Sequence, residues 1–158
     1  MKYANRLRCM MPQSLRSYML LVCMALATPL VHALDHPEAR DYVAEFERRA
    51  QPFEKHLLDQ SRVSGAAQAG AAYAKFLDKE LNQAYQSLLK KIADPKAREQ
   101  LKKSQRAWLA YYKAESDFIA TNWVPDNFGT SYALSRELYW TSLTENRIEV
   151  LLSYLGNY

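Results

Sequence analysis

The side chains whose chemistry could be catalytic are carboxylates set two positions apart, Asp78 with Glu80 and Glu115 with Asp117. Two carboxylates can cleave a glycosidic bond, one as general acid and the other as base or nucleophile. Both pairs lie in stretches with helical periodicity, where charge on a solvated helix face explains them more simply. The sequence also contains no G-x-S-x-G motif and no glycine-rich phosphate loop. We therefore predict no catalytic residues and no enzymatic activity.

Metal-binding residues are scarce after the first 33 positions. Two histidines, His36 and His56, occur there, and no cysteine does. Neither histidine has a second histidine at i+4 or a carboxylate at a recognised ligand spacing, which a zinc site requires. We expect neither a metal ion nor an organic cofactor.

A second set of polar side chains interrupts or flanks the apolar stripes of the predicted helices. Its members are Asn82, Gln105, Arg106, Glu115 and Arg147. An amide or guanidinium near a core is costly unless it is fully hydrogen-bonded. We therefore predict a buried polar network that links three helices. The alternative is that these side chains contact a ligand.

The elements that must position these residues are helices, because apolar residues recur at steps of three and four and no segment sustains period-two alternation. We predict helices over residues 37–59, from a connection at 61–70 to about Ala93, over 95–122, and over 131–155. Pro52 predicts a kink or a short break in the first helix. The fold class is therefore all-α, a compact bundle of about four main helices.

Two apolar stripes define the expected core. The clearer one contains Tyr73, Leu77, Leu81, Tyr85, Leu88 and Ile92. The next helix carries a stripe that includes Trp108 and Ile119, and we expect Trp108 to belong to the core. Between them, Asp94 supplies a helix cap and Pro95 the first helical position, so the two helices should be antiparallel neighbours.

The first 33 residues predict a secretory signal peptide. Basic residues precede an apolar run over residues 18–30, and Val31-His32-Ala33 fits the small-x-small pattern of a cleavage site. The run is shorter than the ~20 apolar residues of a membrane span. We expect residues 34–158 to form a single domain in the periplasm or outside the cell.

Two details of the leader concern its start and its cysteine. Met1, Met10 or Met11 could be the true start. Cys23 offers a lipoprotein cleavage site, but Val22 occupies a position that requires a small residue, so we do not expect a lipid anchor.

The charge balance argues against a nucleic-acid partner. The chain has a net charge of +4, but four of its 21 basic residues and none of its 17 acidic ones lie in residues 1–33, which leaves 17 of each. A neutral domain gives no electrostatic support for binding nucleic acid or an anionic membrane. Residues 114–158 carry two basic and six acidic groups. A functional interpretation needs these acidic groups to form one exposed patch, whereas solvated helix faces are the simpler one.

Three short motifs follow one another along these helices: Leu81-Asn82-x-x-Tyr85, Gln105-x-x-Trp108-x-x-Tyr111 and Thr144-x-x-Arg147. In this order and spacing they resemble the lysozyme-inhibitor LprI-type N-terminal domain family, small secreted bacterial helical proteins, over roughly residues 70–152. The chain departs from the family at Ser116 and near Tyr139, where family members usually carry cysteines, and at Tyr112, where they carry arginine.

The resemblance implies a non-enzymatic secreted protein that binds and inhibits lysozyme-type peptidoglycan hydrolases. The predicted loop at residues 123–130 could then present an aromatic and an acidic group to a cationic hydrolase cleft, with the acidic C-terminal third assisting the encounter. Trp123, Asp126 and Phe128 are the candidate contacts. The plainer interpretation of these residues is an ordinary helix connection with a tethered aromatic ring.

Two other functions remain open from the sequence. A scaffold or accessory module of the cell envelope would hold a partner protein in a helix groove without acting on lysozyme, because fold does not determine function. A carrier of a small molecule or lipid would need an enclosed apolar cavity. An exposed acidic and aromatic loop would favour the inhibitor, and a long apolar groove would favour the scaffold.

Overall fold

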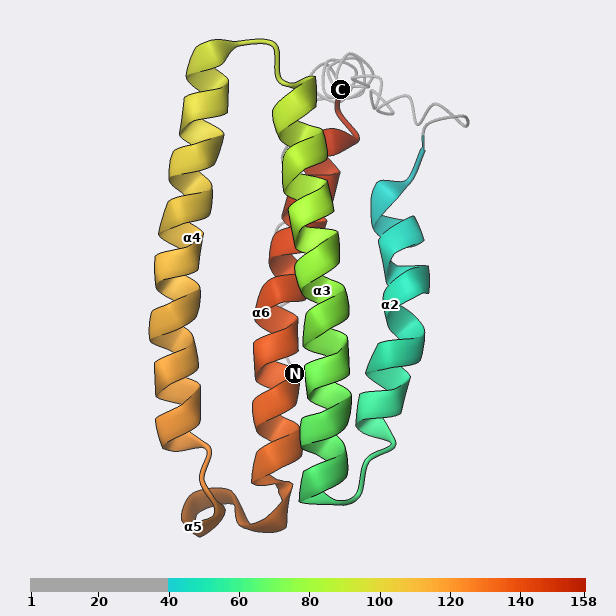
Figure 1. Ribbon diagram of the computed structural model, residues 1–158, viewed down its shortest axis with the longest axis vertical. Coiled ribbons are helices and arrows are strands. Elements are labelled where there is room, and N and C mark those ends of the chain that lie inside the picture. Colours follow the sequence, from blue (N-terminus) through green and yellow to red (C-terminus); the bar gives the residue numbers. More distant parts are fainter. Residues whose placement is uncertain (1–39) are drawn as a thin grey trace, which may run out of the picture. The chain divides into compact units, whose positions relative to one another are not determined.

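The computed structural model describes residues 40–158, and every regular element in this part of the chain is helical. The elements are α2 (Tyr42–Leu58), α3 (Val63–Lys91), α4 (Pro95–Asn122), α5 (Pro125–Phe128), the 3-10 turn η1 (Gly129–Ser131) and α6 (Tyr132–Leu155). Four long helices lie side by side, with α2 and α4 at the two edges (Figure 1). The predicted all-α bundle of four main helices is confirmed.

The predicted signal peptide, its cleavage site after Ala33, Cys23 and the alternative starts all lie outside the described residues. Ala39–Tyr158 forms one compact unit of the chain. Within the described part, no helix combines the length and the apolar character that crossing a membrane requires.

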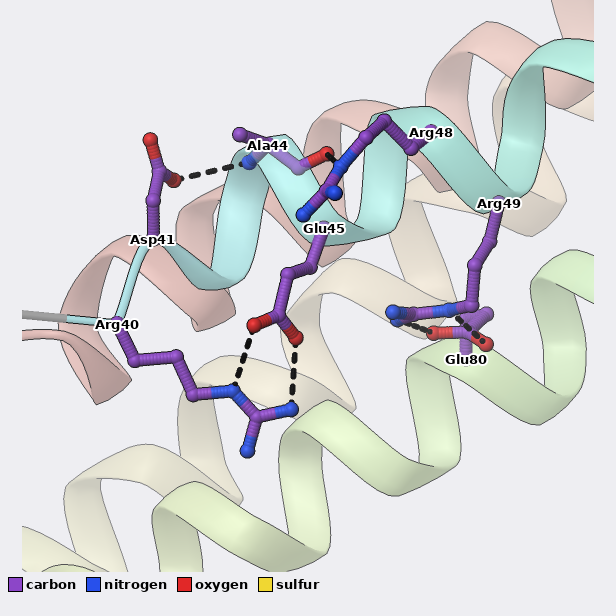
Figure 2. Close-up of polar contacts among 7 residues, drawn as sticks. All are labelled: Arg40, Asp41, Ala44, Glu45, Arg48, Arg49 and Glu80. Carbon is purple, nitrogen blue, oxygen red and sulfur yellow. Dashed lines mark hydrogen bonds and ion pairs between the residues drawn. The ribbon is translucent and has the colours of Figure 1, made fainter.

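Helix α2 begins later than the expected residue 37. Asp41 is its N-cap, and its Oδ1 accepts a hydrogen bond from the backbone N–H of Ala44 at 2.9 Å (Figure 2). A capping aspartate satisfies an N–H group of the first turn that has no partner within the helix, so the helix begins directly after it. Pro52 lies inside α2, which continues through it without a break, and the kink stays a prediction.

The core lies between α2, α3 and α6. The predicted stripe on α3 is confirmed, since five of its six members are buried and the sixth, Tyr85, is half-buried. From α6, Ile148 and Leu151 are fully buried against it. An aromatic stack of Phe46, Phe53, Tyr73 and Phe76 joins α2 to α3. Buried apolar area of this kind is the main stabilising contribution to such a bundle.

One ion pair adds to the packing of α2 on α3. Arg49 donates from Nη2 to Oε2 of Glu80 at 2.7 Å and from Nε to Oε1 at 3.2 Å, and Figure 2 shows the two side chains facing each other. Glu80 is buried, whereas Arg49 stays half in solvent. The two-bond geometry satisfies both carboxylate oxygens, which a buried carboxylate requires.

The predicted connection over residues 61–70 is wrong, because α3 already begins at Val63 and includes Gly65 and Gly70. Gly70 is buried, and a Cβ atom on it would collide with the carboxylate of Glu137 on α6. The glycine therefore serves close approach of a neighbouring side chain and does not end the helix. The short link to α4 is confirmed, with Asp94 accepting from the N–H groups of Lys96 and Ala97.

Helix α4 is packed less deeply than the other long helices. Ile119 is its one fully buried residue, although the helix has 28 residues. Trp108 is half-buried and packs against the edge of the core, so the expected core position is met only in part. The polar residues within its apolar stripe explain this, because burying them would remove them from water without enough partners.

Candidate functional site

The connection between α4 and α6 forms one end of the bundle, and we call this connection, residues 123–131 with α5 and η1, the tip. The tip was predicted as a loop, but it folds into one turn of α-helix and one turn of 3-10 helix. Pro125 begins the α-turn, where its missing N–H costs nothing, and Gly129 follows it with φ of 58°. A positive φ is easily adopted only by glycine, so this residue allows the chain to turn toward α6.

Trp123 and Phe128, two of the three candidate contacts, stack on each other at the tip. Their ring centroids are 4.1 Å apart, and Trp123 also packs against Tyr139 of α6 at 5.1 Å. Both stacked residues are half-buried, while 48% of Tyr139 is exposed. Trp123 and Phe128 thus form a supported aromatic surface in place of a freely tethered ring.

Arg136 of α6 connects that helix to the backbone that carries this aromatic surface. Its Nη2 donates to the backbone carbonyl of Trp123 at 2.6 Å and to that of Ala120 at 3.1 Å. Both carbonyls belong to the C-terminal end of α4, where helix carbonyls lack partners and attract cations. Sequence reasoning missed Arg136, although a basic residue one turn into α6 is a possible signal for such a cap.

Asp126, the third candidate contact, is exposed in the single turn of α5. The structure thus places the three candidates on one short segment, with the carboxylate in solvent and the two rings stacked. Large exposed apolar side chains also occur on α4, including Phe118, which is 59% exposed.

The five residues of the predicted polar network are brought together in part. Arg147 on α6 donates from Nε to Oε1 of Gln105 on α4 at 3.0 Å. Asn82 instead donates to the backbone carbonyl of Asp78 on its own helix, and Arg106 pairs with Glu99 on the surface.

Three of the five residues nevertheless share one surface. Asn82 from α3 lines a groove of about 410 Å³ together with Gln105 and Arg106 from α4. Asn82 and Arg106 are exposed there and Gln105 is half-buried. Glu115, also half-buried, does not line this groove. The arrangement is that of a solvated interhelical groove, bridged to α6 by the bond between Gln105 and Arg147.

A second groove, of about 480 Å³, lies between α2 and α6 and was not predicted. One basic residue, Arg48, and four glutamates line it: Glu47, Glu54, Glu145 and Glu149. Burial raises the pKa of Glu145, the Tyr73 hydroxyl opposes this, and the carboxylates of Glu54 and Glu149 raise it further. Burial likewise raises the pKa of Glu149, and Glu47 adds to it. We call this groove, with its four glutamates, the acidic groove. The one-turn spacing of Glu145 and Glu149 was a sequence signal for it, but only the fold places α2 opposite.

The acidic C-terminal third does not form one exposed patch. Asp126 lies at the tip, Glu145 and Glu149 line the acidic groove, and Asp117 is paired with Lys113 at 2.7 Å. The charge in this third is therefore distributed over several surfaces. No group of three or more side chains that could hold a metal ion occurs among residues 40–158.

The comparisons with known proteins decide the family. The family model described as Lysozyme inhibitor LprI matches residues 58–151, which is more than half of the chain. The chain belongs to the LprI family. The LprI match begins at the last residue of α2 and reaches into α6, so it includes α3, α4 and the tip. No curated protein sequence and no solved structure matches this LprI chain.

Proposed function

We propose that this LprI-family domain is a non-enzymatic inhibitor that binds lysozyme-type peptidoglycan hydrolases after export and removal of residues 1–33. Membership of a family described as lysozyme inhibitors is the observation that carries the proposal. The predicted signal peptide supports the location, since a hydrolase of the cell wall acts outside the cytoplasm.

The contact surface in this proposal is the tip, with Trp123, Asp126 and Phe128 as the contacting residues. The stacked rings and the hydrogen bonds of Arg136 restrain the tip through contacts with α6. A surface that is already ordered loses little conformational entropy when it binds. Asp126 is exposed and can pair with a basic group in the hydrolase cleft, while the aromatic rings supply apolar contact.

The acidic groove has a separate part in the proposal. It lies between α2 and α6, and its four carboxylates outnumber its one basic side chain, Arg48, so the groove attracts a cationic protein over a distance without touching it. Such long-range attraction raises the association rate more than the final affinity. It is screened beyond about 8 Å at physiological ionic strength, so association should slow as salt is added.

The deciding experiment is a cell-wall lysis assay with purified residues 34–158, titrated against lysozymes of several classes. We expect inhibition by the wild type and an inhibition constant at least about tenfold weaker for Asp126→Lys combined with Trp123→Ala. Glu99→Lys is the matched control, because Glu99 is an exposed acid near the start of α4, at the other end of that helix from the tip.

Three results of this assay carry different conclusions. A wild type that inhibits no lysozyme class at micromolar concentration would show that the proposal is wrong. A double variant as potent as the wild type would move the contact to another surface. Equal loss in the Glu99→Lys control would mean that net charge matters and the position of the tip does not.

A carrier function has no support from the grooves described for residues 40–158. The interhelical groove and the acidic groove are open to solvent, with volumes of about 410 and 480 Å³. An enclosed apolar cavity, which a lipid carrier needs, is not among them.

A further inference from the structure

A pocket of about 310 Å³ between α3, α4 and α6 is not used by the proposed function. Three aromatic side chains line it: Trp108 and Tyr112 from α4, and Trp140 from α6. Trp108 and Tyr112 pack at 5.3 Å with their planes tilted by 31°. We call this pocket, with its three rings, the aromatic pocket. Its volume is at the lower end of the range typical of sites for small ligands.

The charged side chains that line the aromatic pocket are both acidic, Asp78 on α3 and Glu137 on α6. Neither forms an ion pair with any residue in the described part of the chain. Asp78 accepts one long hydrogen bond from Asn82, at 3.4 Å. The pocket therefore combines negative charge with the electron-rich faces of aromatic rings, which is the surrounding that organic cations prefer.

Glu137 is held at this pocket by the packing of α6 on α3. Its carboxyl group occupies the space that a side chain at Gly70 would fill, so the missing Cβ of Gly70 makes room for it. Burial raises the pKa of Glu137, and the nearby Arg136 only partly opposes this. Arg136 itself donates to two backbone carbonyls at the end of α4, and its guanidinium carbon lies 5.8 Å from the centre of the Trp140 ring, so Trp108 and Tyr112 are the rings of the pocket without a cation beside them in the described part of the chain. A cation that enters the pocket would compensate a carboxylate that the fold leaves without a partner.

A neutral sugar is the main competing ligand. It could stack on the same rings and accept a hydrogen bond from the indole N–H of Trp140, which is buried without a partner among residues 40–158. Asp78 is exposed and stays solvated, but Glu137 is half-buried, and a carboxylate withdrawn from water without a partner is more costly than a neutral donor in the same position. The observations therefore favour a cation.

We propose that the aromatic pocket binds the guanidinium or ammonium group of an arginine or lysine side chain presented by a partner protein. The rings contact the face of the cation while Asp78 and Glu137 accept its N–H groups. That the partner is the hydrolase rests on the proposed function, but the chemistry of the pocket does not.

The test is a titration of the ¹⁵N-labelled protein, residues 34–158, followed through the indole N–H resonances of its three tryptophans. The probes are N-acetyl-argininamide, tetramethylammonium chloride and the trimer of N-acetylglucosamine. We expect N-acetyl-argininamide to shift Trp108 and Trp140 with an affinity in about the millimolar range, and to leave Trp123 unchanged.

Two variants make the result specific to the pocket. Glu137→Gln keeps the shape of the side chain and removes its charge, so binding should weaken by about five- to tenfold. Glu149→Gln is the matched control, because Glu149 is another partly buried carboxylate of α6 but lines the acidic groove. Its binding of the probe should equal that of the wild type. Equal weakening in both variants would overturn the assignment.

The remaining outcomes of the titration distinguish between the candidate ligands. No shift of Trp108 and Trp140 at about 50 mM N-acetyl-argininamide would overturn the proposal. A response to the sugar alone would assign the pocket to a glycan. Tighter binding of tetramethylammonium, which has no N–H donors, would assign it to a small quaternary cation. Because no hydrolase is present, a wild type that inhibits lysozyme but binds no probe removes this inference and leaves the proposed function standing.

Discussion

Arg147 of α6 and Gln105 of α4 are joined by a hydrogen bond of 3.0 Å that connects two of the sequence motifs typical of the LprI family. A second bond, from Nη2 of Arg147 to the hydroxyl of Ser104, measures 3.2 Å. Burial lowers the pKa of Arg147, and no carboxylate pairs with it in the described part of the chain. The guanidinium is therefore held by neutral acceptors, and it fastens the least buried long helix to the core.

This arrangement predicts an energetic coupling between the two residues. Arg147→Ala should lower the free energy of unfolding by about 1 to 2 kcal/mol, because it leaves the half-buried amide of Gln105 without its partner. In a double-mutant cycle with Gln105→Ala, the coupling should be about 0.5 to 1.5 kcal/mol. Denaturant unfolding measures both values. Arg106→Ala is the control, and this exposed neighbour of Gln105 should cost less than about 0.5 kcal/mol.

The two glycines of α3 should respond in opposite ways to alanine. At Gly65 a Cβ would meet the end of the flexible Gln60 side chain, which can move, so Gly65→Ala should stabilise by up to about 1 kcal/mol. At Gly70 it would collide with the Glu137 side chain, and Gly70→Ala should be neutral or destabilising. Thermal unfolding of both variants checks this.

A Glu137→Ala protein separates two effects of Gly70→Ala on stability, the collision with Glu137 and the higher helix propensity of alanine. In a Glu137→Ala protein the obstacle at Gly70 is gone, so Gly70→Ala should there stabilise by about 0.5 to 1 kcal/mol. The same sign in both backgrounds would mean that Glu137 does not limit the space at Gly70.

The acidic groove predicts a stability that increases under mild acid. Burial raises the pKa of Glu145 and Glu149 in the folded protein, so the folded state binds protons more tightly than the unfolded chain. Their contribution is complete below the unfolded pKa of about 4.3 and is lost as the pH rises through the folded pKa. The melting temperature should therefore rise as the pH is lowered from 7 toward 5.

Glu149→Gln tests this assignment. The amide keeps the shape and removes the charge, so the variant should melt higher than the wild type at pH 7 and at the same temperature near pH 4.5. Glu99→Gln removes an exposed carboxylate that pairs with Lys102 and Arg106. It should not raise the melting temperature at pH 7, and a rise there would point to net charge as the cause.

Depth of burial predicts a difference between two aromatic residues. Tyr73 is 1% exposed in the core stripe, and Tyr73→Ala should lower the free energy of unfolding by about 3 to 5 kcal/mol. Trp108 is half-buried, so Trp108→Ala should cost about 2 kcal/mol despite its larger ring. Denaturant unfolding compares them, and a larger loss at Trp108 would contradict the shallow packing of α4.

The apolar stripe on α3 was predictable because its residues repeat at the helical period and all face one side. Gly65 and Gly70 misled the prediction, since the reason for Gly70 lies in Glu137, on a helix much further along the chain. The acidic groove depends in the same way on α2 packing against α6. Residue type showed that Arg147 needed a partner, but only the fold decides that the partner is Gln105 and not Asn82.

The shallow packing of α4 has a consequence for how the domain opens. The core of α2, α3 and α6 contains almost all fully buried side chains, whereas α4 contributes Ile119 alone. Local unfolding free energies follow such differences in buried contact. The backbone amides of α4 should therefore exchange with deuterium sooner than those in the middle of α3, through an opening that leaves the other three helices folded. In native-state exchange α4 would behave as a cooperative unit of its own.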